Sequence, residues 1–231
     1  MSNLQITKTS DGSDTLFNQD LNQHYHSTYG AVRESQHIFI ESGFLHSIEI
    51  FNSVSGNKTD CLNIIEIGFG TGLNALLTQA EAEKHFLKVH YTAIEAFPVC
   101  ESYWQALNYP QMIGSFDHSK VFTKLHQANW NEAVEISPHF TLHKILCTLE
   151  SYQNTEDEYD LVYFDAFGPD VQPELWTEEV FIKIYKIMVR DGVFVTYSVK
   201  GTVVRALRSA GFTIEKLPGP PGKRHILRAI K

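Results

Sequence analysis

The sequence predicts an open, doubly wound α/β domain with a mostly parallel sheet, preceded by an N-terminal extension. The chain has 231 residues, of which 43% are apolar and 20% charged, an ordinary globular composition. Apolar runs alternate with segments of helical periodicity along most of its length, and a glycine-rich segment joins the first such run to the helix that follows. We expect the extension to cover residues 1–60 and the α/β domain residues 61–231.

The expected elements follow from these patterns in order. Apolar residues at positions 40, 44, 45, 48 and 51 predict an amphipathic helix that leads into the domain, weakened by Gly43, with an exit loop over 53–60. The alternation that follows implies parallel strands joined by helical crossovers, and the last two strands, on either side of the proline-rich loop 218–222, could form a hairpin. Strands are expected at 61–67, 89–94, 140–142, 159–164, 193–197, 213–217 and 225–230, and helices at 73–83, 98–107, 130–134, 178–189 and 202–210.

Several classes of protein are not expected. Residues 1–36 lack a basic start followed by an apolar stretch, and no apolar run approaches the roughly 18 residues needed to cross a bilayer. Cys61, Cys100 and Cys147 are far apart and show no paired spacing, so neither a disulfide framework nor a cysteine-based zinc site is indicated. A reducing cytoplasm is the expected location, with no membrane partner.

Charge is distributed unevenly along the chain. The formal net charge of −8 argues against a protein that coats nucleic acid through a general positive field. Residues 183–231, however, hold eleven Lys or Arg and two acidic residues, a net charge of +9 that leaves −17 on residues 1–182. Two interpretations stay open: solvated faces of surface elements, or a local patch that binds phosphates.

Three glycines at alternate positions lie between the first predicted strand and the following helix. Gly68, Gly70 and Gly72 mark a turn where the backbone can approach a ligand closely. A dinucleotide-binding fingerprint needs a further glycine where Leu73 stands, which disfavours a nicotinamide cofactor. With Glu66 two residues before the first glycine, the spacing resembles the loop of class I methyltransferases, which bind S-adenosylmethionine. The alternative is a tight turn without a ligand.

A second acidic residue supports the cofactor interpretation. Glu95 ends the next predicted strand, where a carboxylate can accept hydrogen bonds from both ribose hydroxyls of an adenosine. An acidic residue at the first strand end suits the cationic ammonium group of S-adenosylmethionine. The predicted cofactor-binding residues are Glu66, Gly68, Gly70, Gly72, Asn74 and Glu95.

The strand at 159–164 runs into a segment rich in proline and glycine. Asp165 therefore stands at the carboxyl end of a strand, facing the crevice where ligands of such sheets bind. Transfer of a methyl group to nitrogen needs an uncharged amine, and a carboxylate here can orient that amine and accept its proton. Phe167 or Trp176 can hold a flat base by stacking. The alternative to a catalytic role is that Asp165 caps the loop and that Phe167 and Trp176 belong to the hydrophobic core.

Two histidine pairs have spacings that a metal ion could use. They are His24 with His26 and His139 with His143. Neither pair has supporting carboxylates or cysteines in a clear motif, so no metal site is predicted.

The chain resembles the methyltransferase part of MnmC, the family of tRNA (5-methylaminomethyl-2-thiouridine) methyltransferases. The resemblance runs nearly end to end and is most specific in the segment 165–177, with its Asp-x-Phe-x-Pro and Pro-x-x-Trp-Thr spacings, and in the early Tyr-His-Ser element. Residues 108–158 match least. The matching segments are Asp11 to Ser13, Tyr25 to Ser27, Gly30 and Ala31, Glu34 and Ser35, Glu66 to Asn74, Glu95, Asp165 to Thr177 and Pro221 to Arg224.

The resemblance implies methylation of the aminomethyl group on carbon 5 of a wobble uridine in tRNA. Asp165 and Phe167 remain the predicted catalytic residues and Trp176 a predicted substrate contact; the resemblance adds Tyr25 and His26 as substrate contacts, with a packed aromatic residue and a surface histidine as the alternative. An anticodon loop can splay its wobble base into a pocket, and its phosphates need cations. Lys223 and Arg224 are the predicted phosphate contacts, with Lys200 and Arg205 as weaker ones. Other enzymes are expected to supply the aminomethyl uridine.

Two alternatives from other classes stay open. One is a methyltransferase, or an aminopropyl-transferring relative, that acts on a small amine, because the acidic N-terminal part attracts a cation. The other is a module that binds tRNA or the cofactor without turnover.

Overall fold

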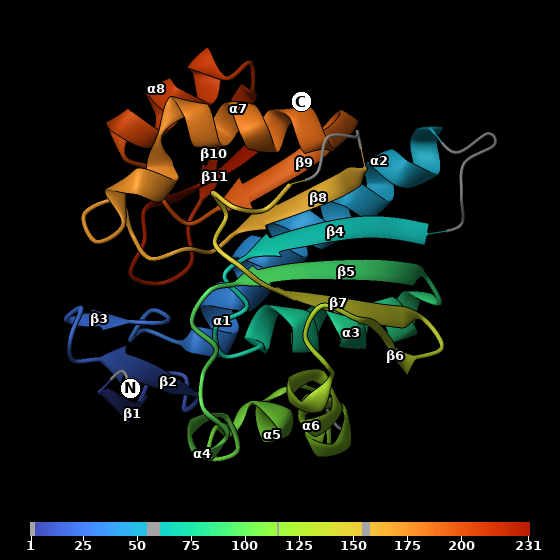
Figure 1. Cartoon of the computed structure of the whole chain (residues 1–231), viewed down its shortest axis with the longest axis vertical. Helices are drawn as coiled ribbons and strands as arrows, with labels where there is room; N and C mark the ends of the chain where they lie inside the picture. The colour runs from blue at the N-terminus through green and yellow to red at the C-terminus, as the bar shows by residue number, and fades with distance from the viewer. Residues whose placement is uncertain (1–2, 55–60, 115, 154–157) are drawn as a thin grey trace.

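The computed structural model describes residues 3–54, 61–114, 116–153 and 158–231, and its centre is an eight-stranded sheet (Figure 1). The strand order is β10-β11-β9-β8-β4-β5-β7-β6. The five strands from β9 to β7 are parallel, whereas β6 and β11 run against their neighbours, so the doubly wound, mostly parallel sheet is confirmed. The strands are β4 (Cys61–Ile67), β5 (Lys88–Glu95), β6 (Ala133–Ser137), β7 (Phe140–Leu146), β8 (Tyr159–Phe164), β9 (Met188–Thr196), β10 (Thr213–Pro218) and β11 (His225–Ile230).

Helices cover both faces of this sheet. One face carries α3 (Leu73–His85) and a long N-terminal helix, and the other carries α7 (Glu178–Ile187) and α8 (Gly201–Ser209) (Figure 1). Alternate strand residues serve the two layers: Ile64 belongs to the core on the first side and Ile65 to the core on the second. The apolar runs seen in the sequence are therefore central strands buried on both faces.

The N-terminal helix is longer than the sequence pattern predicts. It runs without a break through α1 (Ala31–Ser35), the π-helical segment η1 (Gln36–Leu45) and α2 (His46–Val54). A Cβ on Gly43 would lie 3.0 Å from Val195 and 3.3 Å from Tyr163, so the glycine that weakens an isolated helix lets this one pack closely on the sheet. The expected exit loop lies mostly outside the described residues, because 53 and 54 are helical and 55–60 are not described.

A small antiparallel sheet precedes that helix. It consists of β1 (Leu4–Lys8), β2 (Asp14–Asn18) and β3 (Gln23–His24). The Asp14 backbone N–H donates to Asn108 Oδ1 at 2.8 Å, and the Asn108 N–H donates to Asp14 Oδ2 at 3.1 Å. This reciprocal pair joins the small sheet to the short helices below the main sheet, namely α4 (Glu101–Trp104), α5 (Tyr109–Met112) and α6 (Ser119–Gln127).

Several element predictions are wrong in extent or type; the strand expected over 140–142, for example, runs to Leu146 as β7. The helix expected over 98–107 is only the single turn of α4, and it is followed by the tie at Asn108. The helix expected over 130–134 does not form: Asn131 lies in a turn with a φ of +62° and donates its N–H to Lys144 O at 2.6 Å, and the edge strand β6 begins two residues later, at Ala133. Strand β9 begins at Met188, directly after α7, and not at residue 193. The hairpin of β10 and β11 is confirmed.

None of the helices that the structure describes is long and apolar enough to cross a membrane.

Candidate active site

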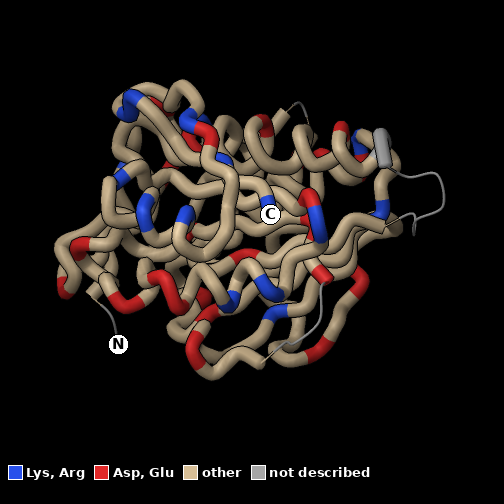
Figure 2. Tube along the Cα trace, turned by 90° about the horizontal axis from the view of Figure 1, so that it is seen from above, with Lys and Arg blue, Asp and Glu red and all other residues tan. Residues whose placement is uncertain are grey.

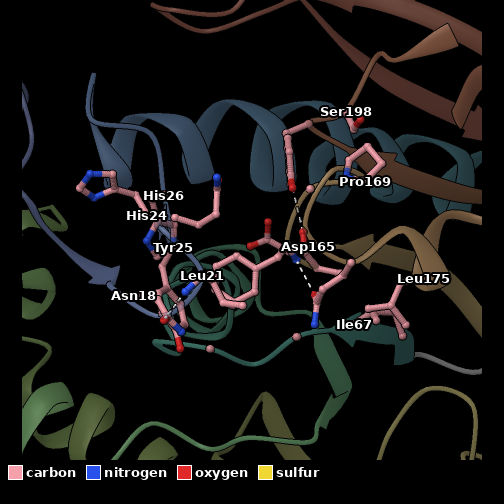
Figure 3. Close-up of a pocket in the computed structure, with 18 of the residues that line it drawn as sticks. Asn18, Leu21, His24, Tyr25, His26, Ile67, Asp165, Pro169, Leu175 and Ser198 are labelled. Atoms are coloured by element: carbon pink, nitrogen blue, oxygen red, sulfur yellow. Dashed lines mark hydrogen bonds between the residues drawn. The ribbon is translucent and has the colours of Figure 1, made fainter. Parts of the chain in front are cut away.

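A cavity of about 1530 Å³ opens where the carboxyl ends of four neighbouring parallel strands meet. Ile67 and Glu95 are the last residues of β4 and β5, whereas Asp165 and Tyr197 directly follow β8 and β9, and all four line the cavity. Figure 3 shows Asp165 in the middle of the lining residues, with Tyr25 from the N-terminal part on one side. The cavity thus lies at the point where the chain order in the sheet reverses, between β4 and β8.

Most of the residues predicted from the sequence line this cavity. The three that do not are Glu66, Gly72 and Trp176. Those that do are Tyr25, His26, Gly68, Gly70, Asn74, Glu95, Asp165, Phe167, Lys223 and Arg224.

The glycine turn is shaped by backbone geometry that other residues do not easily adopt. Gly68 has a φ of +94° and donates its N–H to Ile94 O at 2.9 Å, which ties the turn to the neighbouring strand β5. Gly72 has a φ of +72°, and a Cβ on it would lie 2.9 Å from His126 Nε2. This turn leads directly into α3, so its outer edge presents backbone to the cavity.

Asn74 joins two buried carboxyl groups. Its Nδ2 donates to Glu66 Oε1 and to Asp165 Oδ2, both at 2.9 Å, and so connects the glycine turn with the end of β8. Burial raises the pKa of Glu66 and of Asp165 well above the ordinary carboxyl range. The charge of Asp165 raises the pKa of Glu66 further, and that of Glu34 does the same for Asp165. A positive ligand charge placed here would favour the ionised forms of both groups.

Glu95 is held by backbone donors on both of its oxygens. Oε2 accepts from the Gly70 N–H at 2.9 Å and Oε1 accepts from the Phe97 N–H at 2.7 Å. The carboxylate is only partly buried and lines the cavity, so it keeps acceptor capacity toward a ligand.

Aromatic residues form one wall beside Asp165. The Tyr25 and Phe167 rings meet edge to face with centroids 5.1 Å apart. Burial, followed by the nearby charge of Glu95, raises the pKa of Tyr25 to about 12, so its hydroxyl is neutral at physiological pH. Trp176 is 5% exposed and packs against Phe164, and its Nε1–H donates to Phe167 O at 2.8 Å. Trp176 therefore supports the loop at Phe167 and does not face the cavity.

Basic side chains reach the cavity from the C-terminal part of the chain. Lys223 Nζ lies 3.4 Å from Glu34 Oε1, and Arg224 beside it is exposed. Lys200 also lines the cavity and is ion-paired with Asp170. Arg205, the other weaker candidate, does not line it. Figure 2 shows acidic segments along the left edge and bottom of the molecule and a group of basic segments at upper left.

Among the lining residues to which the sequence interpretation assigned no role, Glu34 and Tyr197 lie nearest to the predicted acceptor side. Glu34, on α1, is 8% exposed, and Tyr197 follows β9. Tyr197 donates its hydroxyl to Ala166 O at 2.8 Å. Tyr197 could have been predicted, because it stands at a strand end at the same sheet edge as Asp165. Glu34 could not, because nothing in its local sequence indicates that it faces the cavity.

His26 connects the cavity to the N-terminal sheet. Its backbone N–H donates to Thr15 Oγ1 at 3.1 Å, and its ring packs edge to face on Tyr109 with centroids 6.0 Å apart. Burial lowers the pKa of His26 to about 4. Within the described ranges, no group of three or more His, Cys, Asp and Glu side chains is placed to hold a metal ion.

The site suits a ligand that is cationic and carries hydroxyl groups. Asn74 Oδ1 is buried and accepts no hydrogen bond from any residue that the structure describes. Glu66 and Asp165 lie on either side of that amide, and the glycine turn leaves room along one edge. The combination fits S-adenosylmethionine, which carries an ammonium group, a sulfonium centre and two ribose hydroxyls.

The fold is that of the class I S-adenosylmethionine-dependent methyltransferases, and the site suits their cofactor. A family model described as S-adenosyl-L-methionine-dependent methyltransferase matches residues 117–231, in agreement with this assignment.

More particularly, the chain is related to MnmC, as the sequence resemblance indicated. It is 30% identical over 212 residues to the tRNA 5-methylaminomethyl-2-thiouridine biosynthesis bifunctional protein MnmC of Pseudomonas fluorescens, a match that covers 88% of this chain and 31% of that protein. The MnmC of Legionella pneumophila (strain Lens) is 28% identical over 247 residues, covering 97% and 36%. The chain thus spans about a third of the length of these curated relatives.

A solved structure has the same fold. The crystal structure of MNMC2 from Aquifex aeolicus superimposes with a TM-score of 0.75 at 24% sequence identity, over 99% of this chain and 70% of that one.

Proposed function

We propose that the protein transfers a methyl group from S-adenosylmethionine to the 5-aminomethyl group of (2-thio)uridine at the wobble position of tRNA, giving 5-methylaminomethyl-(2-thio)uridine. The observation that carries this proposal is Asp165, a carboxyl group facing the cavity and joined through Asn74 to the glycine turn. The name of the MnmC relatives supports the choice of tRNA as substrate. We place the reaction in the cytoplasm, where tRNA is modified.

The residues divide into a cofactor side and an acceptor side. On the cofactor side, Asn74 and the edge of the turn from Gly68 to Gly72 hold the amino acid part of S-adenosylmethionine, and Glu95 accepts from its ribose hydroxyls. Glu66 lies behind Asn74, orients its amide and contributes a negative charge. When bound, the cofactor supplies an electrophilic methyl group. In this division, the part of the N-terminal extension around Tyr25 and His26 forms a lid over the domain, since both residues line the cavity.

Asp165 positions the acceptor and takes its proton. The amine nitrogen keeps its lone pair when the proton passes to a carboxylate oxygen of Asp165, and that lone pair forms the new nitrogen–carbon bond as the carbon–sulfur bond breaks. A buried carboxylate with a raised pKa is a stronger base once ionised. Phe167 and Tyr25 hold the uracil ring beside it.

At the mouth of the cavity, Lys223 and Arg224 contact the phosphates of the anticodon loop. Both residues lie in the connection between β10 and β11, at the rim where a splayed nucleotide would enter. Trp176, buried beneath Phe167, contributes indirectly by holding that backbone in place.

The direct test is transfer of a radiolabelled methyl group to defined acceptors. Wild-type protein should label tRNA that carries 5-aminomethyl-2-thiouridine and leave both the same tRNA without the modification and polyamines unlabelled. Labelling of polyamines instead would favour a small-amine transferase. Calorimetric binding of S-adenosylmethionine without transfer to any acceptor would favour a module without turnover.

A further inference from the structure

The side-chain ammonium of Lys223 lies in an acidic and aromatic cage inside the cavity. Its Nζ is 3.4 Å from Glu34 Oε1 and 4.9 Å from the centroid of the Tyr197 ring, over the ring face. The Lys223 side chain is 29% exposed and that of Glu34 only 10%, so the pair is largely removed from water. Lys223 thus extends into the cavity although it belongs to a surface connection.

The cage is held by contacts that do not involve Lys223. Glu34 Oε2 accepts the Ser27 backbone N–H at 2.7 Å, and the Tyr197 hydroxyl donates to Ala166 O at 2.8 Å. Each partner therefore keeps its orientation if the lysine leaves. Because Ala166 follows Asp165 in the chain, the cage adjoins the carboxyl group of the proposed reaction.

The pKa shifts of Asp165 and Tyr197 show that these residues, Glu34 and Lys223 affect one another electrostatically. After burial, the charge of Glu34 is the largest cause that raises the pKa of Asp165, and Lys223 acts in the opposite direction. Burial raises the pKa of Tyr197 most, followed by the charges of Asp165 and Glu34. The lysine ammonium is thus in contact with one carboxyl group and one neutral phenol ring, and the Asp165 carboxyl group is close enough for their charges to affect its pKa.

A carboxylate beside an aromatic face is a general site for an ammonium group. A free primary amine is protonated in neutral water, so an aminomethyl acceptor arrives as an ammonium ion. That ion has the same charge and the same number of donors as the lysine end group.

We propose that Glu34 and Tyr197 form the binding site for the acceptor's ammonium group and that Lys223 fills this site until the acceptor displaces it. This inference rests on the proposed function. The acceptor nitrogen then moves from the cage to Asp165, the residue before Ala166, which removes one proton and leaves the lone pair on nitrogen for the methyl carbon. The displaced Lys223 stays beside Arg224 at the mouth, where it meets a phosphate of the tRNA.

Kinetics with two acceptors separate these roles. One acceptor is tRNA carrying 5-aminomethyl-2-thiouridine, and the other is the free nucleoside 5-aminomethyl-2-thiouridine, which has no phosphate. Glu34→Gln keeps an acceptor for the Ser27 N–H but loses the charge, so KM should rise roughly tenfold for both acceptors, with affinity for S-adenosylmethionine little changed. Lys223→Met should lower KM for the nucleoside, because the competing ammonium is gone, and raise KM for the tRNA.

Matched controls are Glu41→Gln, on the same helical segment and outside the cavity, and Lys216→Met, on the exposed part of β10. Neither should change KM for either acceptor. An unchanged KM in Glu34→Gln, or a higher nucleoside KM in Lys223→Met, overturns the inference while the proposed function stands. Absence of transfer by the wild-type protein would instead remove the proposed function.

A second measurement does not depend on turnover. Acetylation of Lys223, mapped by peptide mass, should accelerate when 5-aminomethyl-2-thiouridine is added together with S-adenosylhomocysteine. The nucleoside 2-thiouridine, which lacks the amine, should leave the rate unchanged. Equal acetylation rates with both nucleosides show that the amine does not displace Lys223 and contradict the proposal.

Discussion

At the scale of single residues, the proposed methyl transfer depends on the negative charge of the Asp165 carboxyl group. Asp165→Asn keeps the shape of the side chain and its ability to accept from Asn74, but it cannot take a proton from the acceptor amine. Methyl transfer should fall by roughly a hundredfold or more, the usual size of a lost general base, and the affinity for S-adenosylmethionine should stay within about threefold. Calorimetry and the transfer assay check both. Loss of cofactor binding at normal turnover would reassign Asp165 to the cofactor side.

The raised pKa values of Glu66 and Asp165 predict proton release when the cofactor binds. In the free protein, burial raises the pKa of both groups, so they stay protonated at pH values where ordinary carboxyl groups are ionised. A sulfonium charge nearby favours their ionised forms. Their pKa is thus lower in the complex, so protons leave on binding and affinity rises with pH in that window. S-adenosylhomocysteine has the same amino group without the sulfonium charge and should release fewer protons.

Calorimetry in buffers of different ionisation enthalpy measures that release directly. Equal proton release with the two ligands would mean that the sulfonium does not approach these carboxyl groups.

Most of the site residues predicted from the sequence line the cavity, because strand ends and glycine turns are local features. Glu66, Glu95 and Asp165 were predicted from their places after apolar runs. Glu34 and Tyr197 were assigned no role, because their meeting with Lys223 depends on three segments far apart in the chain. Trp176 was expected to face the base, but its indole N–H is used by a backbone carbonyl in the core.

At the scale of elements, helix α6 supports the glycine turn through one buried imidazole. His126 Nε2 lies 3.1 Å from Thr71 O, and the ring stacks on Trp104 with centroids 4.5 Å apart. Burial lowers the pKa of His126 to about 3. The unfolded chain takes up this proton below about pH 6.5 and the folded protein only near pH 3, so the free energy of unfolding should fall as pH falls through that window.

Urea unfolding at pH 7 and pH 5 tests this contribution. His126→Gln should lose less stability than the wild type between the two pH values, because it has no imidazole to protonate. The buried carboxyl groups act in the opposite direction in both proteins, so the difference between the two slopes isolates His126. Equal slopes would contradict the assignment.

Some strands of the main sheet were predicted with their observed bounds. Strands β4, β8 and β11 are examples, since their sequences are buried on both faces of the sheet. A helix was expected over 130–134, where a turn at Asn131 leads into the half-exposed edge strand β6. Hydrogen bonds of Asn131 with Lys144 and Leu146 fix that turn, and the local sequence does not show them. The helical segment 31–54 also begins earlier than the apolar pattern predicts. Its first turns bury the polar residues Glu34 and Ser35, so they show no apolar periodicity.

At the scale of the whole molecule, basic residues at one mouth of an acidic protein restrict where a polyanion can bind. Replacing both Lys223 and Arg224 by Glu should weaken tRNA binding and flatten its dependence on salt, by roughly one unit of log–log slope for each phosphate that the variant no longer neutralises. Lys216→Glu with Arg190→Glu makes the same change in net charge at residues outside the cavity and should leave the slope nearly unchanged. If both pairs of substitutions change the salt dependence equally, Lys223 and Arg224 are ordinary solvated surface residues and not specific phosphate contacts.

The proposed reaction requires that one cavity hold both reactants, the methyl donor over the Gly68–Gly72 turn and the acceptor nitrogen beside Asp165. A crystal structure of the protein with S-adenosylhomocysteine tests it most directly. The account predicts the amino acid part near Glu66 and Asn74, the ribose at Glu95, and the sulfur facing the side of the cavity that Asp165 and Tyr197 line. A ligand bound elsewhere, or a sulfur that faces away from Asp165, would contradict it.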